Sequence, residues 1–221
     1  MNGHDFPKKD TPEKDAEQTD FVLTNGGEAN TDRSGQIDGS KTREGGKAIP
    51  YGIYDVCANV GWVGVGITHD TAEFAVNSIQ GWYDQMGVER YPEAERLLVT
   101  ADCGGSNGVR VRLWKRELQR LADETGRTIE VCHYPSGTSK WNKIEHLSHF
   151  AKLERASAHQ QDGRWDVATT TKTGLVVRAQ LDPTVYEKRR KVSDAEMATI
   201  NITKDEFHPE WNYVIAPRRA K

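Results

Sequence analysis

Apolar and polar positions change their spacing along the chain, and the first ordered pattern is that of a β-hairpin. Residues 49–56 and 62–67 form two short apolar runs on either side of a turn at residues 58–61. Runs of this length, bounded by Gly and Asn, are typical of paired strands. Gly64 and Gly66 alternate with Val and Ile in the second run, so we expect another element to approach this strand closely.

A helical pattern follows the hairpin. Residues 70–73 read Asp-Thr-Ala-Glu, which is a capping box and predicts a helix that starts at Asp70. Apolar residues then recur at helical spacing, and Gly87 is expected to close this helix. Residues 96–102 are mostly apolar and predict a strand at the centre of a sheet.

The same alternation continues through the middle of the chain. Ser106 or Asn107 is expected to cap a second helix, which Gly126 ends. The buried face of this helix is predicted from its large apolar residues, Leu113, Trp114, Leu118 and Leu121. A further strand is predicted at residues 128–133, and a helix from Trp141 onward.

The N-terminal segment has a different composition. Residues 1–46 contain few large apolar side chains, and Asp, Glu, Lys, Thr and Gly dominate. Such a segment cannot bury enough apolar surface to offset its ordering entropy, so we expect a disordered polar tail. The whole chain of 221 residues has a net charge of −3, which gives no overall positive charge for nucleic acid.

Cysteine usage and hydropathy narrow the class of protein further. The three cysteines have no Cys-x-x-Cys spacing, which argues against a disulfide framework or a structural zinc site. No signal peptide is recognisable, and no apolar run is long enough to span a membrane. We therefore expect a cytoplasmic protein.

Acidic residues stand where two predicted elements place them near one sheet edge. Asp102 ends an apolar strand and is followed by Gly104 and Gly105, while Glu145 lies on the helix predicted after the next strand. Ligands of α/β sheets usually bind at the carboxyl ends of parallel strands. Two carboxylates that converge there can hold a hard cation such as Mg²⁺.

Several blocks of the sequence resemble one family. The blocks "LLVTADCGGSNGVRVRLWKRELQRLADETG" and "VCHYPSGTSKWNKIEH" resemble the second and third acidic blocks of DDE transposases, and most closely the Rhodopirellula-type DDE-domain family. "GKAIPYGIYDV", "GWVGVGITHDTAEFAV", "KVSDAEMATIN" and "FHPEWNYVIAPR" resemble further blocks of that family. The likeness covers roughly residues 46–145 and 168–219.

The resemblance implies a fold and a chemistry. It implies an α/β, ribonuclease-H-like (DDE integrase-type) mixed sheet with flanking helices, with a catalytic domain at residues 47–158 and its C-terminal extension at residues 159–221. Asp102 and Glu145 would be catalytic residues and ligands of Mg²⁺ or Mn²⁺, which clamp the attacking and leaving oxygens of a phosphodiester. DNA would be the partner, in a nucleoid-associated and, if active, homo-oligomeric protein.

The chain departs from the family at its start. DDE transposases need three acids, and the first lies on the first strand. That block has no counterpart here, so we expect the first strand to be missing, either by truncation or because an in-frame strand lies upstream of Met1. Asp55 and Asp70 are nearby, but Asp55 is expected to pair locally and Asp70 to cap its helix.

A second departure follows Glu145. Relatives continue with a segment containing Asn-Trp-Arg-Gly-Arg-Pro-Leu, whereas residues 150–158 read Phe-Ala-Lys-Leu-Glu-Arg-Ala-Ser-Ala. One permitted coding of that peptide, read from its second base, yields Ser-Arg-Asn-Trp-Arg-Gly-Arg-Pro-Leu. We therefore hypothesise that residues 146–167 are translated out of frame. Codons that cannot yield the shifted peptide would refute this.

Other polar residues have open roles. His133 and His146 could contact DNA or orient a carboxylate, but a lone His is more often a structural group, so neither is assigned. Asn107 could cap a helix or orient a ligand. The basic runs at residues 189–191 and 218–221 are candidates for phosphate contact or simply solvated surface.

The leading hypothesis is a DDE-type transposase fragment, for DNA strand cleavage and strand transfer. Because only two of the three expected acids are present, we expect this polypeptide to be inactive. One alternative is a non-enzymatic, degenerate remnant of a mobile element with residual DNA binding. The other is a different ribonuclease-H-like nuclease that takes its first acid from elsewhere, for instance from Asp55.

Overall fold

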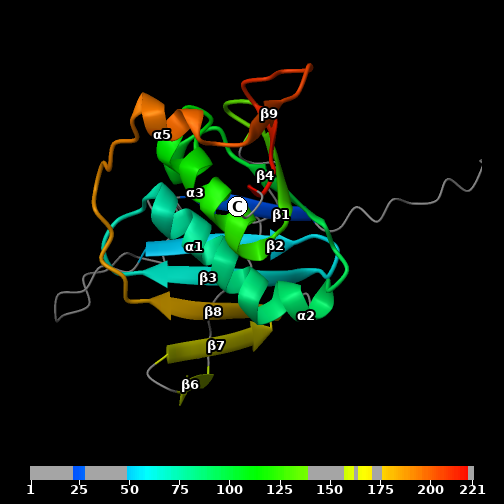
Figure 1. The fold of residues 1–221 in the computed structure, drawn as a ribbon. Helices are drawn as coiled ribbons and strands as arrows, with labels where there is room; N and C mark the ends of the chain where they lie inside the picture. Colours follow the sequence, from blue (N-terminus) through cyan, green and yellow to red (C-terminus); the bar gives the residue numbers. More distant parts are fainter. Residues whose placement is uncertain (1–21, 28–48, 139–156, 162–163, 171–175, 219–221) are drawn as a thin grey trace, which may run out of the picture.

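A computed structural model describes residues 22–27, 49–138, 157–161, 164–170 and 176–218. These residues form a single mixed sheet with helices on it (Figure 1). The strands are β1 Val22–Gly27, β2 Ile49–Asp55, β3 Val60–Gly66, β4 Arg96–Ala101, β5 Thr128–His133, β6 Ser157–Gln161, β7 Arg164–Thr170, β8 Val176–Asp182, β9 Ile202–Lys204 and β10 Asn212–Ile215. The helices are α1 Ala72–Trp82, α2 Val88–Arg90, α3 Arg112–Thr125 and α5 Asp194–Ala198, with a π-helical turn at Tyr83–Gly87 and a 3₁₀ turn at Gly105–Asn107.

The sheet mixes parallel and antiparallel pairs. Its strand order is β6-β7-β8-β3-β2-β1-β4-β5-β10-β9. β1 pairs with β4, β4 with β5 and β3 with β8 in parallel, and the other neighbours are antiparallel. The expected mixed α/β sheet with flanking helices is therefore confirmed.

The expectation of a missing first strand is wrong. β1 lies between β2 and β4, where Leu23 pairs with Asp55 on one side and Val99 on the other. The expectation of disorder is likewise wrong for Val22–Gly27, while the rest of the segment 1–46 lies outside the described residues. A central strand is stabilised by backbone hydrogen bonds to two neighbouring strands. The amino-acid composition of the strand's own segment does not reveal these hydrogen bonds.

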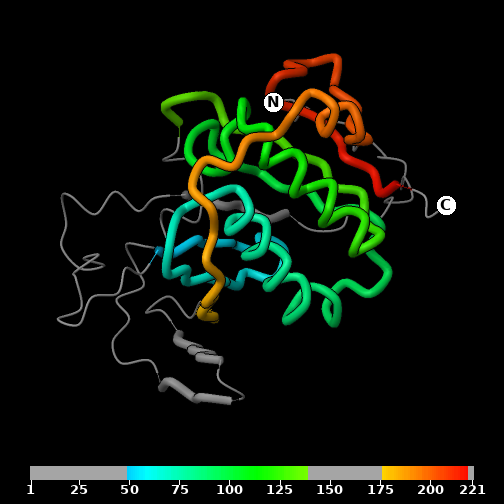
Figure 2. The backbone as a smooth tube through the Cα atoms, turned by 60° about the vertical axis from the view of Figure 1, so that its left-hand side comes forward, coloured from blue at the N-terminus to red at the C-terminus, as the bar shows by residue number. Residues whose placement is uncertain are grey.

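Helices α1 and α3 cover one face of the sheet (Figure 2). Every second residue of β5 is buried beneath them: Ile129 and Val131 are fully enclosed, and the residues between them are half-buried. The predicted close approach at the two strand glycines is confirmed. A Cβ built on Gly64 would lie 2.2 Å from Ser78 Oγ of α1, and one on Gly66 would lie 3.0 Å from the Phe74 ring.

Helix ends differ from the sequence expectations at three of the four predicted positions. Thr71, rather than Asp70, is the N-cap of α1, and its hydroxyl accepts a hydrogen bond from the Phe74 backbone N–H. The chain does not leave the helical path at Gly87: a π-helical turn that includes this residue leads directly into α2. The next helix, α3, begins at Arg112 and not at Ser106 or Asn107. The fourth expectation is confirmed, because Gly126 ends α3 in the left-handed conformation that glycine adopts at little cost.

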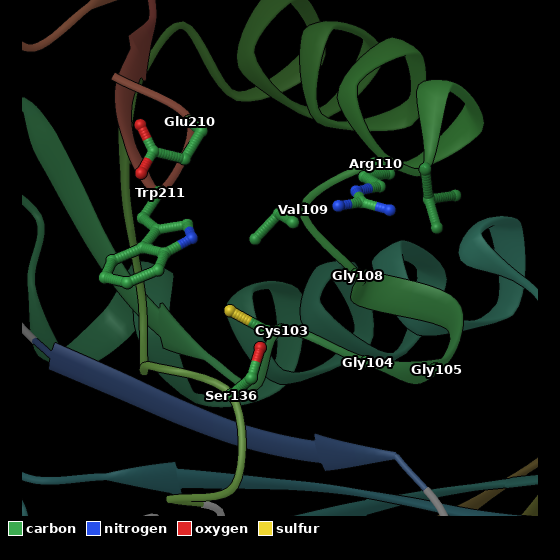
Figure 3. A pocket seen from close by; sticks show the side chains of 10 residues that line it. Cys103, Gly104, Gly105, Gly108, Val109, Arg110, Ser136, Glu210 and Trp211 are labelled. Carbon is green, nitrogen blue, oxygen red and sulfur yellow. The ribbon is translucent and has the colours of Figure 1, made fainter. Parts of the chain in front are cut away.

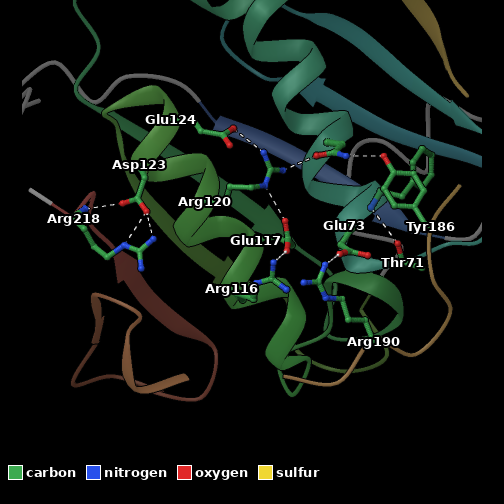
Figure 4. A network of polar contacts seen from close by, with 12 residues as sticks. Thr71, Glu73, Arg116, Glu117, Arg120, Asp123, Glu124, Tyr186, Arg190 and Arg218 are labelled. Atoms are coloured by element: carbon green, nitrogen blue, oxygen red, sulfur yellow. Dashed lines mark hydrogen bonds and ion pairs between the residues drawn. The ribbon is translucent and has the colours of Figure 1, made fainter. Parts of the chain in front are cut away.

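The segment from β8 to α5 crosses the helical layer and is tied to it by polar contacts (Figure 4). The Asn77 side chain of α1 donates to Tyr186 Oη at 2.7 Å and accepts from Arg120 of α3 at 2.6 Å. Arg190 pairs with Glu73 at 2.6 Å. These contacts hold α1, α3 and the crossing segment in one arrangement above the sheet.

Candidate functional site

Asp102 is the first residue after β4. The strands β1 and β5 flank β4 and run parallel to it, so Asp102 lies where the carboxyl ends of these three strands meet. At the end of the strand, the Tyr134 backbone N–H donates to the Ala101 carbonyl at 2.8 Å. Two side chains contact the next carbonyl, that of Asp102: His133 Nδ1 at 3.0 Å and Asn107 Nδ2 at 3.5 Å. The predicted position of Asp102 at a sheet edge is thus the one observed.

A glycine loop follows Asp102 and leaves the space above it open. Gly105 has φ +68°, a conformation that other residues rarely adopt. A Cβ built on Gly104 would meet no atom within 4 Å. Asn107 does not cap α3, whose N-cap is Val111, so its amide contact with the Asp102 carbonyl is the role that the structure favours.

A cavity of about 640 Å³ lies beside this loop (Figure 3). It is bounded by the glycine loop, by the turn after β5 and by the residues just before β10. Its lining residues are Cys103, Gly104, Gly105, Gly108, Val109, Arg110, Val111, Ser136, Glu210 and Trp211. Figure 3 shows the Arg110 guanidinium and the Trp211 indole reaching toward it from opposite sides.

Burial keeps two groups near Asp102 uncharged. Burial lowers the pKa of His133 to about 4, against the opposing effect of its hydrogen bond to the Asp102 carbonyl, so the imidazole is neutral at pH 7. Burial also raises the pKa of the Cys103 thiol, with a smaller contribution from Asp102. A thiolate is disfavoured at Cys103, which argues against a nucleophile there.

Asp55 does not join Asp102. Across β1 it is level with Val99, three residues before Asp102 and two strands away, so the two Cα atoms lie roughly 14 Å apart. Its carboxylate is fully buried and accepts hydrogen bonds from Tyr91 Oη at 3.0 Å and from the Ala58 backbone N–H at 2.9 Å. The expected local pairing is confirmed by these contacts, and the position of Asp55 argues against the alternative in which it supplies the first catalytic acid.

Glu145 and His146 lie outside the described residues, so the convergence of Asp102 and Glu145 stays a prediction. Within the described part of the chain, no group of three or more His, Cys, Asp or Glu side chains could hold a metal ion. The Asp102 carboxylate has the oxygen donors that a hard cation prefers, and a site there would need further ligands beside it.

One arginine of each basic run forms an ion pair within the chain. Arg190 pairs with Glu73, and Arg218 pairs with Asp123 at 2.5 Å. Arg218 also donates its backbone N–H to Asp123. These contacts favour an intramolecular role for both arginines over phosphate contact.

Two residues near Asp102 carry no sequence signal for this site. Trp114 was predicted only as part of a buried helix face, and Tyr213 lies in a C-terminal strand far from Asp102 in the chain. Trp114 Nε1 donates to Tyr213 Oη at 2.9 Å, and Tyr213 Oη lies 3.1 Å from His133 Nε2. The pairing of β10 with β5 brings Tyr213 level with Val131, two residues before His133, and α3 places Trp114 above them.

The fold and the acid at the end of β4 define a mixed α/β domain with a polar sheet-edge site. The sequence model of the Rhodopirellula transposase DDE domain family matches residues 14–217, and the chain belongs to this family. Comparisons with curated proteins and with solved structures give no match. Among the helices that the structure describes, none has the length and apolar character needed to cross a membrane.

Proposed function

We propose that this chain is a ribonuclease-H-like DDE transposase domain that has lost DNA strand cleavage and strand transfer. The observation that carries the proposal is the order of the central strands. β3, β2 and β1 form an antiparallel meander, and β4 and β5 follow in parallel with β1. This is the order expected of a ribonuclease-H-like sheet once a first strand precedes the hairpin.

Asp102 and Glu145 are the acids assigned to the site. Both would hold Mg²⁺ or Mn²⁺, the ions that stabilise charge on the oxygens of a phosphodiester during in-line displacement. The glycine loop supports this assignment, because no atom lies within 4 Å of the place where a Gly104 side chain would begin, two residues after Asp102. The partner is DNA at mobile-element ends, with a homo-oligomer as the expected active form.

The inactivity rests on the composition of β1. In DDE transposases the first acid lies on the first strand, whereas β1 reads Val-Leu-Thr-Asn-Gly-Gly and contains neither Asp nor Glu. Its register sets Asn25 opposite Ala101, immediately before Asp102. A strand therefore occupies the expected place without the expected carboxylate, and Asp55 cannot replace it.

A strand-cleavage assay tests this proposal. The full chain is incubated with supercoiled plasmid and with element-end duplexes in Mg²⁺ or Mn²⁺, beside an Asp102→Asn control. We expect no nicking above the control. Robust nicking that Asp102→Asn abolishes would contradict the inactivity and support an active enzyme.

The same samples separate a transposase domain from a remnant without DNA chemistry of any kind. Fluorescence anisotropy with the end duplexes is expected to detect binding that weakens as salt rises, as phosphate contacts do. Cleavage-inactive protein that binds DNA is the result expected of the proposed domain. Absence of both activities would remove DNA as the partner of this polypeptide.

A further inference from the structure

A buried chain of hydrogen bonds connects α3 and β10 to the backbone of Asp102. It runs from Trp114 Nε1 to Tyr213 Oη (2.9 Å), on to His133 Nε2 (3.1 Å), and from His133 Nδ1 to the Asp102 carbonyl oxygen (3.0 Å). The three side chains are 0%, 2% and 5% exposed, in that order. Water therefore competes little for these bonds.

The two end groups of this hydrogen-bond chain, Trp114 and the Asp102 carbonyl, fix the position of every proton in it. The Trp114 indole can only donate, and the Asp102 carbonyl can only accept. His133 Nδ1 must therefore carry a proton to bond with the carbonyl, and in the neutral ring Nε2 is then bare. Tyr213 Oη accepts from Trp114, so its own proton is available for Nε2. Every donor and acceptor of the hydrogen-bond chain is satisfied in this single tautomer. A doubly protonated His133 ring would leave the Tyr213 hydroxyl proton without an acceptor in that hydrogen-bond chain.

The last bond of the chain acts at the residue that carries the carboxylate. β4 ends at Ala101, and the carbonyl of Asp102 is the first one beyond the strand. His133 contacts this carbonyl, supported by the longer contact of Asn107. Fixing this carbonyl fixes the peptide plane after Asp102, and with it the direction in which the Asp102 side chain leaves the backbone.

We propose that His133, held as the Nδ1–H tautomer by Tyr213 and Trp114, is a positioning residue for the Asp102 carboxylate. The proposal rests on the proposed function in one respect, namely that Asp102 is a cation ligand. Outer partners that orient ligands typically contribute about 10–100-fold to metal affinity. The residue acts through a backbone carbonyl, so it need not touch the cation or the DNA.

Two isosteric substitutions separate positioning from packing. In His133→Asn the side-chain amide nitrogen replaces Nδ1 and can still donate to the Asp102 carbonyl. In His133→Gln it replaces Nε2 and reaches toward Tyr213 instead. Val131→Ala, on the same strand and fully buried, is expected to lower stability without removing any atom of the hydrogen-bond chain and is the matched control.

Three readouts are taken on the full chain. Nitrogen-15 NMR of the wild-type ring at pH 7 identifies the protonated nitrogen of His133. The carbon-13 shift of the Asp102 carbonyl reports its hydrogen bond in each variant. Mn²⁺ titration followed by electron paramagnetic resonance measures cation affinity, with Asp102→Asn as the reference for loss of the ligand.

In the wild type we expect the proton of the His133 ring on Nδ1. The carbon-13 shift of the Asp102 carbonyl should stay the same in His133→Asn and change in His133→Gln. The Mn²⁺ affinity should be about tenfold weaker in His133→Gln alone. An Nε2–H ring, or equal carbonyl shifts and affinities in the two variants, overturns the proposal. So does Val131→Ala if it weakens Mn²⁺ binding as much as His133→Gln does.

Failure of the proposed function has a different signature. If wild type and Asp102→Asn bind Mn²⁺ equally, Asp102 is no cation ligand, and the ring and carbonyl spectra alone then judge the positioning. If His133→Gln does not fold, Tyr213→Phe replaces it, because it keeps the ring and removes the proton donor to Nε2. It is expected to lower the Nδ1–H population and shift the Asp102 carbonyl, and unchanged spectra overturn the proposal.

Discussion

Acidification should destabilise the fold through His133. The folded chain holds this ring neutral to a pKa of about 4, because it is buried and its two nitrogens already have partners. The unfolded chain protonates it at about 6.5. Between these values the unfolded state binds more protons than the folded state, so stability is fully present above pH 6.5 and falls as the pH falls toward 4.

The magnitude follows from the two pKa values. They differ by about 2.5, and one pH unit corresponds to about 1.4 kcal/mol, so the whole window is worth about 3 kcal/mol. At pH 4.5 most of this loss has occurred, about 2.5 kcal/mol. For a domain whose total stability is about 5–15 kcal/mol, this is a large fraction.

Urea unfolding at pH 7.5 and 4.5, with wild type and His133→Asn side by side, measures the effect. The Asn variant keeps a donor toward the Asp102 carbonyl but does not titrate, and the carboxylates of both proteins titrate alike. The stability difference between wild type and variant should therefore fall by about 2.5 kcal/mol on acidification. An identical pH dependence in both proteins would refute the reasoning, because His133 would then take up its proton in the folded state.

Two further predictions concern the packing around the sheet. Gly64→Ala should lower the free energy of unfolding in urea by about 1–3 kcal/mol, because the new methyl group would lie 2.2 Å from Ser78 Oγ. Adding Ser78→Ala to the same protein should recover part of this loss. Wild-type stability in Gly64→Ala would show that α1 is free to move away from β3. Asp55→Ala should cost about 1–3 kcal/mol because it leaves Tyr91 Oη and a backbone N–H unmatched, whereas Asp55→Asn should cost less and leave Mn²⁺ affinity unchanged. Loss of Mn²⁺ binding in Asp55→Asn would show that the Asp55 carboxylate is a ligand of the cation.

Local patterns predicted the elements whose signals are local. The spacing of apolar residues placed β5 at its observed bounds, and Gly126 marked the end of α3 because a left-handed cap has a residue preference of its own. The alternating glycines of β3 correctly signalled the contact with α1. In each case the deciding interaction lies within one element or between adjacent ones.

Features decided by distant partners were not predictable in this way. β1 is composed like a tail, and it is a strand because β2 and β4 pair with it from both sides. The contact of Tyr213 with His133 depends on how β10 pairs with β5, which no short window of sequence encodes. Thr71 in place of Asp70 is a smaller case, since both residue types cap helices and the chain path selects between them.

The residues that hold the sheet edge in shape differ from those that chemistry there would need. The edge is fixed by the Ala101 carbonyl, by the neutral ring of His133 and by buried partners from α3 and β10, none of which carries charge. Loss of an acid from β1 removes none of these contacts. The contacts that hold this edge in shape are therefore separate from the Asp102 carboxylate, to which the proposed function assigns the cation. The His133 variants address these contacts and the cleavage assay the carboxylate, so their outcomes are independent.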